Sequence, residues 1–157
     1  MILKIGLSEE NLEKSINLLG VVLSDEMTLY IKTRKFHWNV AGQSFMELHK
    51  LFEYQYKQIE ESIDEIAERI SKLGGKAIGT MKEFSELSRL KENPNQYPSQ
   101  KDMIQELVKD HETIIIQLRK DITVFDEENN DAGSADFVTG LMEKHETMSW
   151  MLRRYLS

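Results

Sequence analysis

The 157-residue sequence contains no cysteine and only two prolines. Without cysteine, the chain can form no disulfide, no thiolate metal site and no cysteine nucleophile. Because proline is scarce while glutamate, lysine, leucine, isoleucine and methionine are common, little interrupts helical hydrogen bonding. The composition therefore predicts an all-α protein, and the length predicts a single domain over residues 1–157.

The sequence also lacks a long apolar run. A membrane-spanning helix needs roughly 18 consecutive apolar residues, but the run over 18–23 is already interrupted by Gly20. The beginning of the chain turns acidic at Glu9 before the apolar core of a signal peptide develops. We therefore expect a soluble, cytoplasmic protein that makes no contact with a membrane.

Positive charge is in short supply. The 20 lysines and arginines stand against 27 aspartates and glutamates, which gives a formal net charge of −7. Because binding to nucleic acid depends on neutralising phosphates with lysine and arginine, this balance argues against a general attraction to DNA. It suits a protein that handles cations.

Four long segments carry apolar residues at intervals of three and four, which is the period of an amphipathic helix. Ser8 can cap the first segment, and Ser44 with Glu47 forms a capping box that opens the second. The apolar stripe of the second segment begins at Phe45. The expected boundaries are Ser8 to about Trp38, Ser44 to about Gly75, Ser99 to about Phe125, and about Ser134 to Tyr155.

The spacing of the four segments distinguishes between bundle types. Short links join the first to the second and the third to the fourth, whereas a long connection separates the second from the third. Thr80 and Glu83 form another capping box, which predicts a short helix over Met81–Arg89 inside that connection. This pattern predicts a ferritin-like four-helix bundle with one additional short helix.

Four residues are candidate metal ligands: His37, His49, Asp64 and Glu68. Imidazole combined with carboxylate suits iron, manganese or zinc, and two carboxylates one helical turn apart can reach one point. The alternative for each is structural, namely a histidine hydrogen-bonded in a core or an interface, or a carboxylate on a solvated face. We favour that alternative for His111 and His145, which fall within the apolar stripes of the last two segments.

The spacing shows that one chain cannot close such a site. His49 and Asp64 are 15 positions apart on one helix, which corresponds to roughly 22 Å along its axis. They nevertheless face a similar side, because 15 steps of about 100° leave roughly 60° between them. An antiparallel second copy of this helix would bring Asp64 and Glu68 to His49. The first two segments also contain no Glu-x-x-His motif for a ferritin-type centre inside one bundle.

Three stretches together resemble a known family. The sequences HWNVAG from His37, FMELHKLF from Phe45 and DEIAER from Asp64 are similar to the ferroxidase signature of the Dps family of mini-ferritins. The similarity covers nearly the whole chain, including Gly74-Gly75. It implies a dodecamer in which His37 and His49 of one subunit bind iron together with Asp64 and Glu68 of its neighbour.

The resemblance also implies an activity. Such a protein is a ferroxidase that oxidises ferrous iron with hydrogen peroxide, and more slowly with oxygen, and stores the ferric mineral inside a hollow homo-oligomer. Iron detoxification would be the consequence of this oxidation and storage. Glu53 could be an additional ligand or a relay for a second iron, and Trp38 could donate an electron; an exposed structural role and packing are their respective alternatives.

Acidic residues at the corner between the last two segments are candidates for an iron-entry pore. The resemblance suggests acidic iron-entry pores around three-fold axes, formed here by Asp126, Asp131 and Asp136. From the sequence alone, this corner is a solvated loop.

Many relatives coat DNA through termini rich in lysine and arginine. Here the segment before the first helix contains only Lys4, and the end offers Arg153-Arg154. This argues against direct DNA binding. A nucleoid-protecting DNA-binding protein with secondary ferroxidase activity is the alternative function, and a purely structural helical oligomer is the third.

Overall fold

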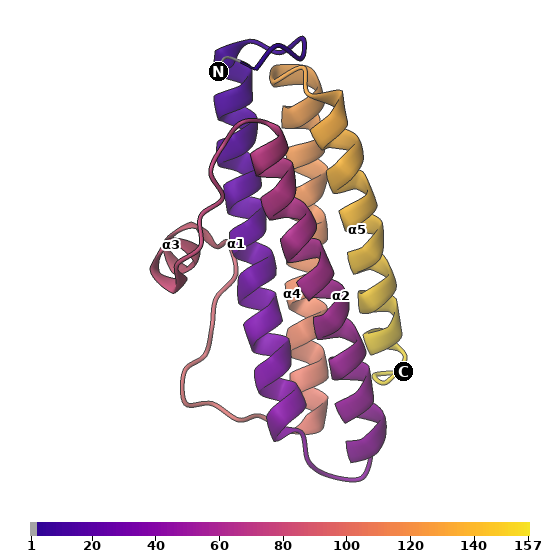
Figure 1. The fold of residues 1–157 in the computed structure, drawn as a ribbon. Helices are drawn as coiled ribbons and strands as arrows, with labels where there is room; N and C mark the ends of the chain where they lie inside the picture. Colours follow the sequence, from indigo (N-terminus) through magenta and orange to yellow (C-terminus); the bar gives the residue numbers. More distant parts are fainter. Residues whose placement is uncertain (1–2) are drawn as a thin grey trace.

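The structure, a computed structural model, describes residues 3–157. Four long helices form a bundle, with a short helix in the connection between the second and third and a π-helical turn after the third (Figure 1). No strand occurs among the described residues. The predicted all-α, ferritin-like arrangement is confirmed. The elements are α1 (Glu9–Asn39), α2 (Phe45–Lys72), α3 (Met81–Leu87), α4 (Gln100–Thr123), η1 (Val124–Glu128) and α5 (Ala132–Arg153).

The bundle consists of two antiparallel hairpins, α1 with α2 and α4 with α5. The connection between them runs along the side of the bundle from the end of α2 to the start of α4, and α3 projects from it next to α1 (Figure 1). This crossover makes α2 and α4 run in the same direction. None of the helices in residues 3–157 is long and apolar enough to cross a membrane.

The predicted starts of α1, α2, α3 and α4 are confirmed, but one of these four predicted side-chain caps does not form. The Ser8 hydroxyl accepts a hydrogen bond from the Asn11 amide at 3.1 Å, Ser99 caps α4, and Thr80 forms the predicted capping box with Glu83. Ser44 occupies the N-cap position of α2 as predicted, but the predicted capping box does not form, because the backbone of Ser44 (φ −96°, ψ 30°) is outside the extended region and its side chain makes no cap hydrogen bond.

The C-terminus of α2 depends on a glycine. Gly74 has φ +87°, and its amide donates to the Ser71 carbonyl while the Gly75 amide donates to the Ile70 carbonyl, both at 3.0 Å. This is a Schellman motif, which places a left-handed residue just after the helix. It turns the chain sharply into the connection.

The corner between α4 and α5 is more ordered than a solvated loop. Residues 124–128 form a π-helical turn, closed by the Asn129 amide on the Val124 carbonyl at 3.0 Å. Asp131 caps α5 by accepting from the Ser134 amide at 3.0 Å and pairs with Arg69 of α2 at 3.1 Å. The corner is therefore fastened to the other hairpin.

Apolar side chains from all four long helices fill the interior. Complete burial of one such leucine, isoleucine or phenylalanine contributes about 1.5–3 kcal/mol, so this core is the main source of bundle stability. Phe45 is an exception to the predicted stripe of α2, because its side chain is 39% exposed. The largest fully buried side chains include Leu19, Leu23, Leu29, Phe52, Ile59, Ile66, Leu107, Ile114 and Phe125.

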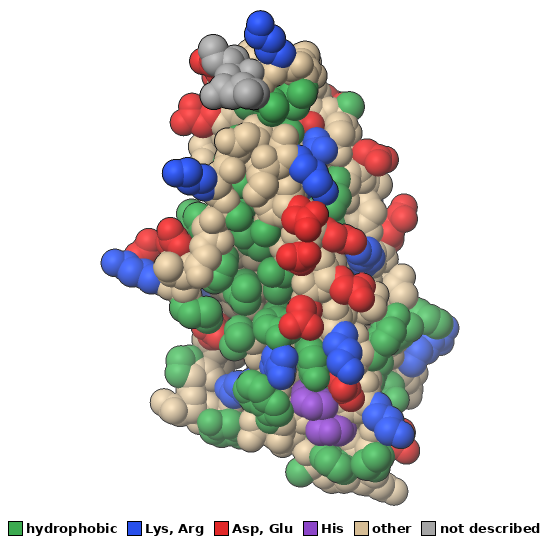
Figure 2. All heavy atoms as spheres, in the orientation of Figure 1, with side chains coloured by type: hydrophobic (Ala, Val, Ile, Leu, Met, Phe, Trp, Pro, Cys, Tyr) green, Lys and Arg blue, Asp and Glu red, His purple; other side chains and the backbone are tan. Residues whose placement is uncertain are grey.

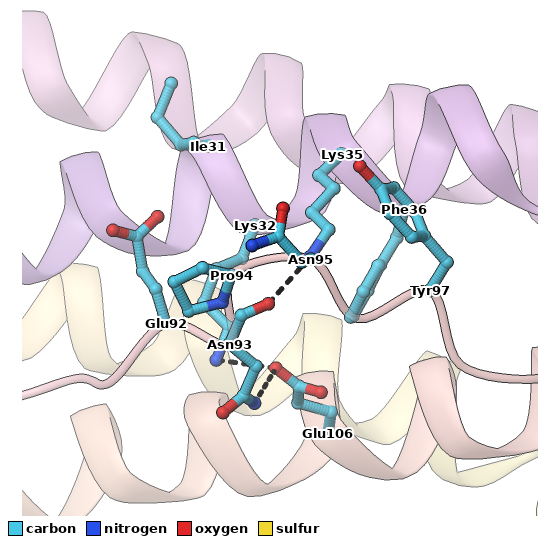
Figure 3. Close-up of a pocket in the computed structure, with 10 residues that line it drawn as sticks. All are labelled: Ile31, Lys32, Lys35, Phe36, Glu92, Asn93, Pro94, Asn95, Tyr97 and Glu106. Atoms are coloured by element: carbon cyan, nitrogen blue, oxygen red, sulfur yellow. Dashed lines mark hydrogen bonds and ion pairs between the residues drawn. The ribbon is translucent and has the colours of Figure 1, made fainter.

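Buried ion pairs hold the long connection against the bundle. Lys32 of α1 pairs with Glu106 at 2.9 Å and Asp110 at 2.6 Å on α4, and it donates to the Lys91 carbonyl of the connection at 2.8 Å. A cavity of about 270 Å³ lies beside it, between α1 and the segment around Pro94 (Figure 3).

Arg89 lies just after α3 and anchors the connection to the bundle at a second point. Its guanidinium pairs with Asp25 of α1 at 2.7 Å and with Asp121 of α4 at 2.8 Å. Its backbone amide donates to Asp25 at 2.6 Å. Burial raises the pKa of Asp25 above its ordinary value, while the Arg89 guanidinium opposes that shift.

Candidate metal centre

The histidines His37 and His49 lie together at the end of the α1–α2 hairpin. Their rings stack with centroids 3.8 Å apart and an angle of 18° between the planes. His37 is only 8% exposed, and His49 is half-buried. α1 supplies one ring in its last turn and α2 supplies the other in its first turns, so the short link at residues 40–44 brings them together.

Backbone hydrogen bonds fix the form of both rings. The Nδ1 of His37 lies 2.8 Å from the His49 carbonyl oxygen, and the Nδ1 of His49 lies 2.9 Å from the His37 carbonyl oxygen. Because a carbonyl only accepts, each Nδ1 must carry the hydrogen. Each neutral ring therefore has its lone pair on Nε2, which is the form that binds a metal.

Glu53 follows His49 by one turn of α2. Its carboxylate accepts from Lys57 at 2.6 Å. The Lys57 ammonium, and to a smaller extent the two imidazoles, lowers the pKa of Glu53 below its ordinary value. Glu53 is therefore a carboxylate near the histidine pair, and Lys57 is a competitor for any metal there.

Aromatic and cationic side chains adjoin the pair. Tyr56 meets the His37 ring edge-on at 5.3 Å between centroids. The Arg34 guanidinium lies over the rings of Tyr56 and Trp38, at 4.5 Å and 5.3 Å from their centroids. Trp38 itself is 63% exposed, so packing within the subunit does not account for its position.

The acidic candidates lie farther along α2. Asp64 and Glu68 are both exposed; Glu68 pairs with Lys72 at 3.3 Å, while Asp64 makes no ion pair with any side chain of residues 3–157. Figure 2 shows histidine side chains near one end of this face and acidic side chains gathered farther up.

Within one chain, the candidate ligands thus fall into two separate groups. Within residues 3–157, no three histidine, aspartate or glutamate side chains are placed to hold a metal ion together. The structure brings His37 and His49 together, with Glu53 nearby, and leaves Asp64 and Glu68 apart from them. This agrees with the separation of roughly 22 Å expected from helix geometry.

The three acidic residues expected at an entry pore differ in their surroundings. Asp126 and Asp136 are exposed at the α4–α5 corner. Asp131 is 3% exposed and already engaged by Arg69 and Ser134. Its carboxylate is therefore occupied within the subunit, which leaves Asp126 and Asp136 as the residues that can face a passing cation.

The bundle interior contains a polar group that was not predicted from the sequence. Glu26, His111 and His145 are connected by hydrogen bonds and are 0–1% exposed. The two histidines were expected to be packed in the core, which is where they lie, but their link to Glu26 was not expected. The available signal was an acidic residue in the middle of the apolar stripe of α1.

The fold and this site define a ferritin-like protein, and comparisons with known proteins agree. Residues 16–157 match the model of the ferritin-like domain family. The chain is 46% identical over 154 residues to an uncharacterized low temperature-induced protein of Nostoc sp., covering 98% of this chain and 86% of the relative. It is 34% identical over 142 residues to DNA protection during starvation protein 2 of Bacillus anthracis, covering 90% and 96%.

A solved structure gives the same result. The Dps protein of Vibrio cholerae O1, described as a member of the ferritin-like diiron-carboxylate superfamily, superposes with a TM-score of 0.90 at 28% identity, covering 100% of this chain and 98% of that one. The chain therefore belongs to the Dps family of ferritin-like proteins. Membership of this family supports iron binding and a role in iron storage and protection.

Proposed function

We propose that this protein is a ferroxidase that oxidises ferrous iron with hydrogen peroxide and stores the ferric product inside a homo-oligomer, with oxygen as a slower oxidant. The paired histidines carry this proposal, because each Nδ1–H is bound to the other's carbonyl and each Nε2 is left free to bind a metal. A purely structural pair would have no need to present two lone pairs.

The site requires a second copy of the chain. A two-fold axis across α2 would bring Asp64 and Glu68 of the partner subunit opposite His37 and His49. Neutral imidazoles bind ferrous iron, and the carboxylates stabilise the greater charge of ferric iron. Glu53 is a further oxygen ligand once iron displaces Lys57.

The proposed reaction balances without any other reductant. Two ferrous ions each give up one electron, and hydrogen peroxide takes both as its O–O bond breaks. The two peroxide oxygens take up two protons and become water, and hydrolysis of the two ferric ions to an oxyhydroxide releases six protons, so the net release is four protons for every two irons. Asp126 and Asp136 would draw ferrous iron towards the interior, and Trp38 would supply an electron when iron alone does not complete the reduction of peroxide.

Stopped-flow mixing of ferrous iron with peroxide or with oxygen tests the activity. The parent is compared with an Asp64→Ala/Glu68→Ala variant after both are shown to assemble. We expect fast, peroxide-dependent oxidation in the parent that is lost in the variant. Equal slow rates in both would exclude the ferroxidase and favour a structural or DNA-protecting role.

Mixing two inactive variants tests whether the site lies between subunits. His37→Ala/His49→Ala lacks one half and Asp64→Ala/Glu68→Ala lacks the other. If the halves come from different subunits, a mixed dimer contains one intact site and one empty site, so random co-assembly restores about one quarter of the parent sites. A mixture as inactive as its components would show that each site belongs to one subunit.

A further inference from the structure

The interior of the bundle contains a hydrogen-bonded chain of three ionisable side chains. Nε2 of His145 on α5 lies 2.5 Å from a carboxylate oxygen of Glu26 on α1, and Nδ1 of His145 lies 2.9 Å from Nδ1 of His111 on α4. All three side chains are 0–1% exposed. They lie in the middle of the helices and take no part in the proposed iron site.

The geometry of the two imidazoles favours a hydrogen bond between them over a shared metal ion. Their ring centroids are 5.1 Å apart while the two Nδ1 atoms are 2.9 Å apart. The separation of the centroids is close to the maximum that this contact allows, so the nitrogens face each other head-on. Two ligands of one metal would instead converge on a point beside the line that joins them.

Charge balance within the core points to His145 as the counter-ion of Glu26. The neighbouring cations are engaged elsewhere: Arg89 pairs with Asp25 and Asp121, and Lys32 pairs with Glu106 and Asp110. The buried residues of α2 include no acid, lysine, arginine or histidine. A buried carboxylate without a compensating charge is strongly unfavourable.

His111 is unsuited to carry that charge. Its Nε2 is buried without a hydrogen bond to any described residue. Burial, and after it the neighbouring His145, lowers the pKa of His111 well below its ordinary value. His111 therefore acts as a neutral partner, and a proton in this chain belongs to Glu26 and His145.

We propose that Glu26 and His145 share one proton in the core, forming a carboxylate–imidazolium pair that joins α1 to α5 and has neutral His111 of α4 as its second hydrogen-bond partner. The folded chain then keeps a proton that the unfolded chain releases above about pH 6.5. Folding and assembly would thus be favoured near neutral pH and weakened in alkaline solution, which makes this cluster a pH-sensitive element of the bundle.

Counting protons on unfolding tests the proposal directly. The protein is unfolded with guanidinium at pH 8 in weakly buffered solution, and the released protons are titrated in a pH-stat. The Glu26→Gln variant keeps the shape of the side chain but cannot stabilise the cation. We expect the parent to release about one proton per chain more than Glu26→Gln. Equal release by the two proteins would overturn the proposal.

A second variant keeps the proposal testable if Glu26→Gln does not fold or assemble. If Glu26→Gln does not assemble, His111→Asn replaces it, because this change leaves the Glu26–His145 pair in place. His111→Asn should release the same extra proton as the parent at pH 8. If it releases about one proton fewer, the proton is held by His111, and the assignment to Glu26 and His145 is wrong.

A cobalt-binding experiment tests whether His111 and His145 hold a metal ion instead of a hydrogen bond. Co²⁺ is added to the His37→Ala/His49→Ala variant, which lacks the histidines of the iron site, and binding is followed spectroscopically. We expect no binding that depends on His111. One Co²⁺ per chain, lost when His111→Asn is added, would overturn the proposal by showing that the two nitrogens coordinate a metal.

Discussion

Two backbone carbonyls determine what His37 and His49 can do. Each carbonyl holds the Nδ1 hydrogen of the opposite ring, so neither ring can turn its Nδ1 to a metal without breaking a bond. Nε2 is therefore the atom of each ring that is available to a metal. The structural and chemical roles of each histidine fall on different nitrogens and can be separated by substitution.

His49→Asn should make this separation visible. The asparagine amide can still donate to the His37 carbonyl from the position of Nδ1, but it offers no ligand at the position of Nε2. We expect the thermal midpoint to change little and peroxide-dependent iron oxidation to fall at least as far as the ~10–100-fold typical of changes around metal ligands. His49→Gln, which reaches the Nε2 position, is the matched control. A full-rate His49→Asn variant would contradict a ligand role for this residue.

His111 gives the protein a defined response to acid. Burial lowers the pKa of this imidazole well below its ordinary value of 6.5. Below about pH 6.5 the unfolded chain takes up a proton at His111 that the folded chain does not, so stability falls by up to about 1.4 kcal/mol per chain for each pH unit. Above that pH neither state is protonated there, and the contribution is constant.

Unfolding curves from pH 7 to pH 5 test this response. His111→Asn cannot take up the proton, so its stability should fall less steeply with acid than that of the parent, although it can be lower at pH 7. Denaturant midpoints at a fixed protein concentration provide the measurement. Parallel pH profiles for the two proteins would show that His111 does not control the acid response.

At the scale of helices, periodicity and capping predicted most of what the structure contains. The four long helices and α3 depend on local patterns, so a single sequence is enough to find them. Ser44 was placed correctly at the N-cap of α2, but its predicted capping box does not form, because a capping box needs extended backbone at the cap and Ser44 has φ −96° and ψ 30°. The π-helical turn after α4 has no comparable sequence signal.

The tie between the long connection and the bundle depends on Arg89. Removing its guanidinium leaves Asp25 and Asp121 as buried carboxylates without their partner. We expect Arg89→Met to cost about 3–5 kcal/mol of unfolding free energy per chain. Arg119→Met removes an exposed pair with Glu146 and should cost less than about 1 kcal/mol.

Denaturant unfolding of Arg89→Met and Arg119→Met at one protein concentration measures the loss of unfolding free energy in each variant. A small and equal loss would mean that the connection is held by other contacts, such as those of Lys32. A large loss confined to Arg89→Met would identify this ion pair as the main anchor of the α3 segment.

At the scale of the whole molecule, helix geometry predicts that His49 lies far from Asp64 and Glu68 within one chain. The length of α2 keeps Asp64 and Glu68 away from His49 whatever the details of packing, so this followed from helix geometry alone. The link between Glu26 and His145 could not be predicted in the same way. Those residues are 119 positions apart, and their contact depends on the rotation of α1 and α5 about their axes.

The net negative charge of the chain argues against DNA binding. With a formal charge of −7 per chain, an oligomer accumulates negative potential that opposes the phosphate backbone. We therefore expect no complex in a gel-shift experiment with duplex DNA, even at low salt. A variant carrying an added lysine-rich N-terminal extension is the matched positive control, because it supplies the counter-charges that binding needs. If the parent shifts DNA at low salt and loses the complex as salt increases, local clusters such as Arg153-Arg154 outweigh the net charge, and the nucleoid-protecting function becomes the better account.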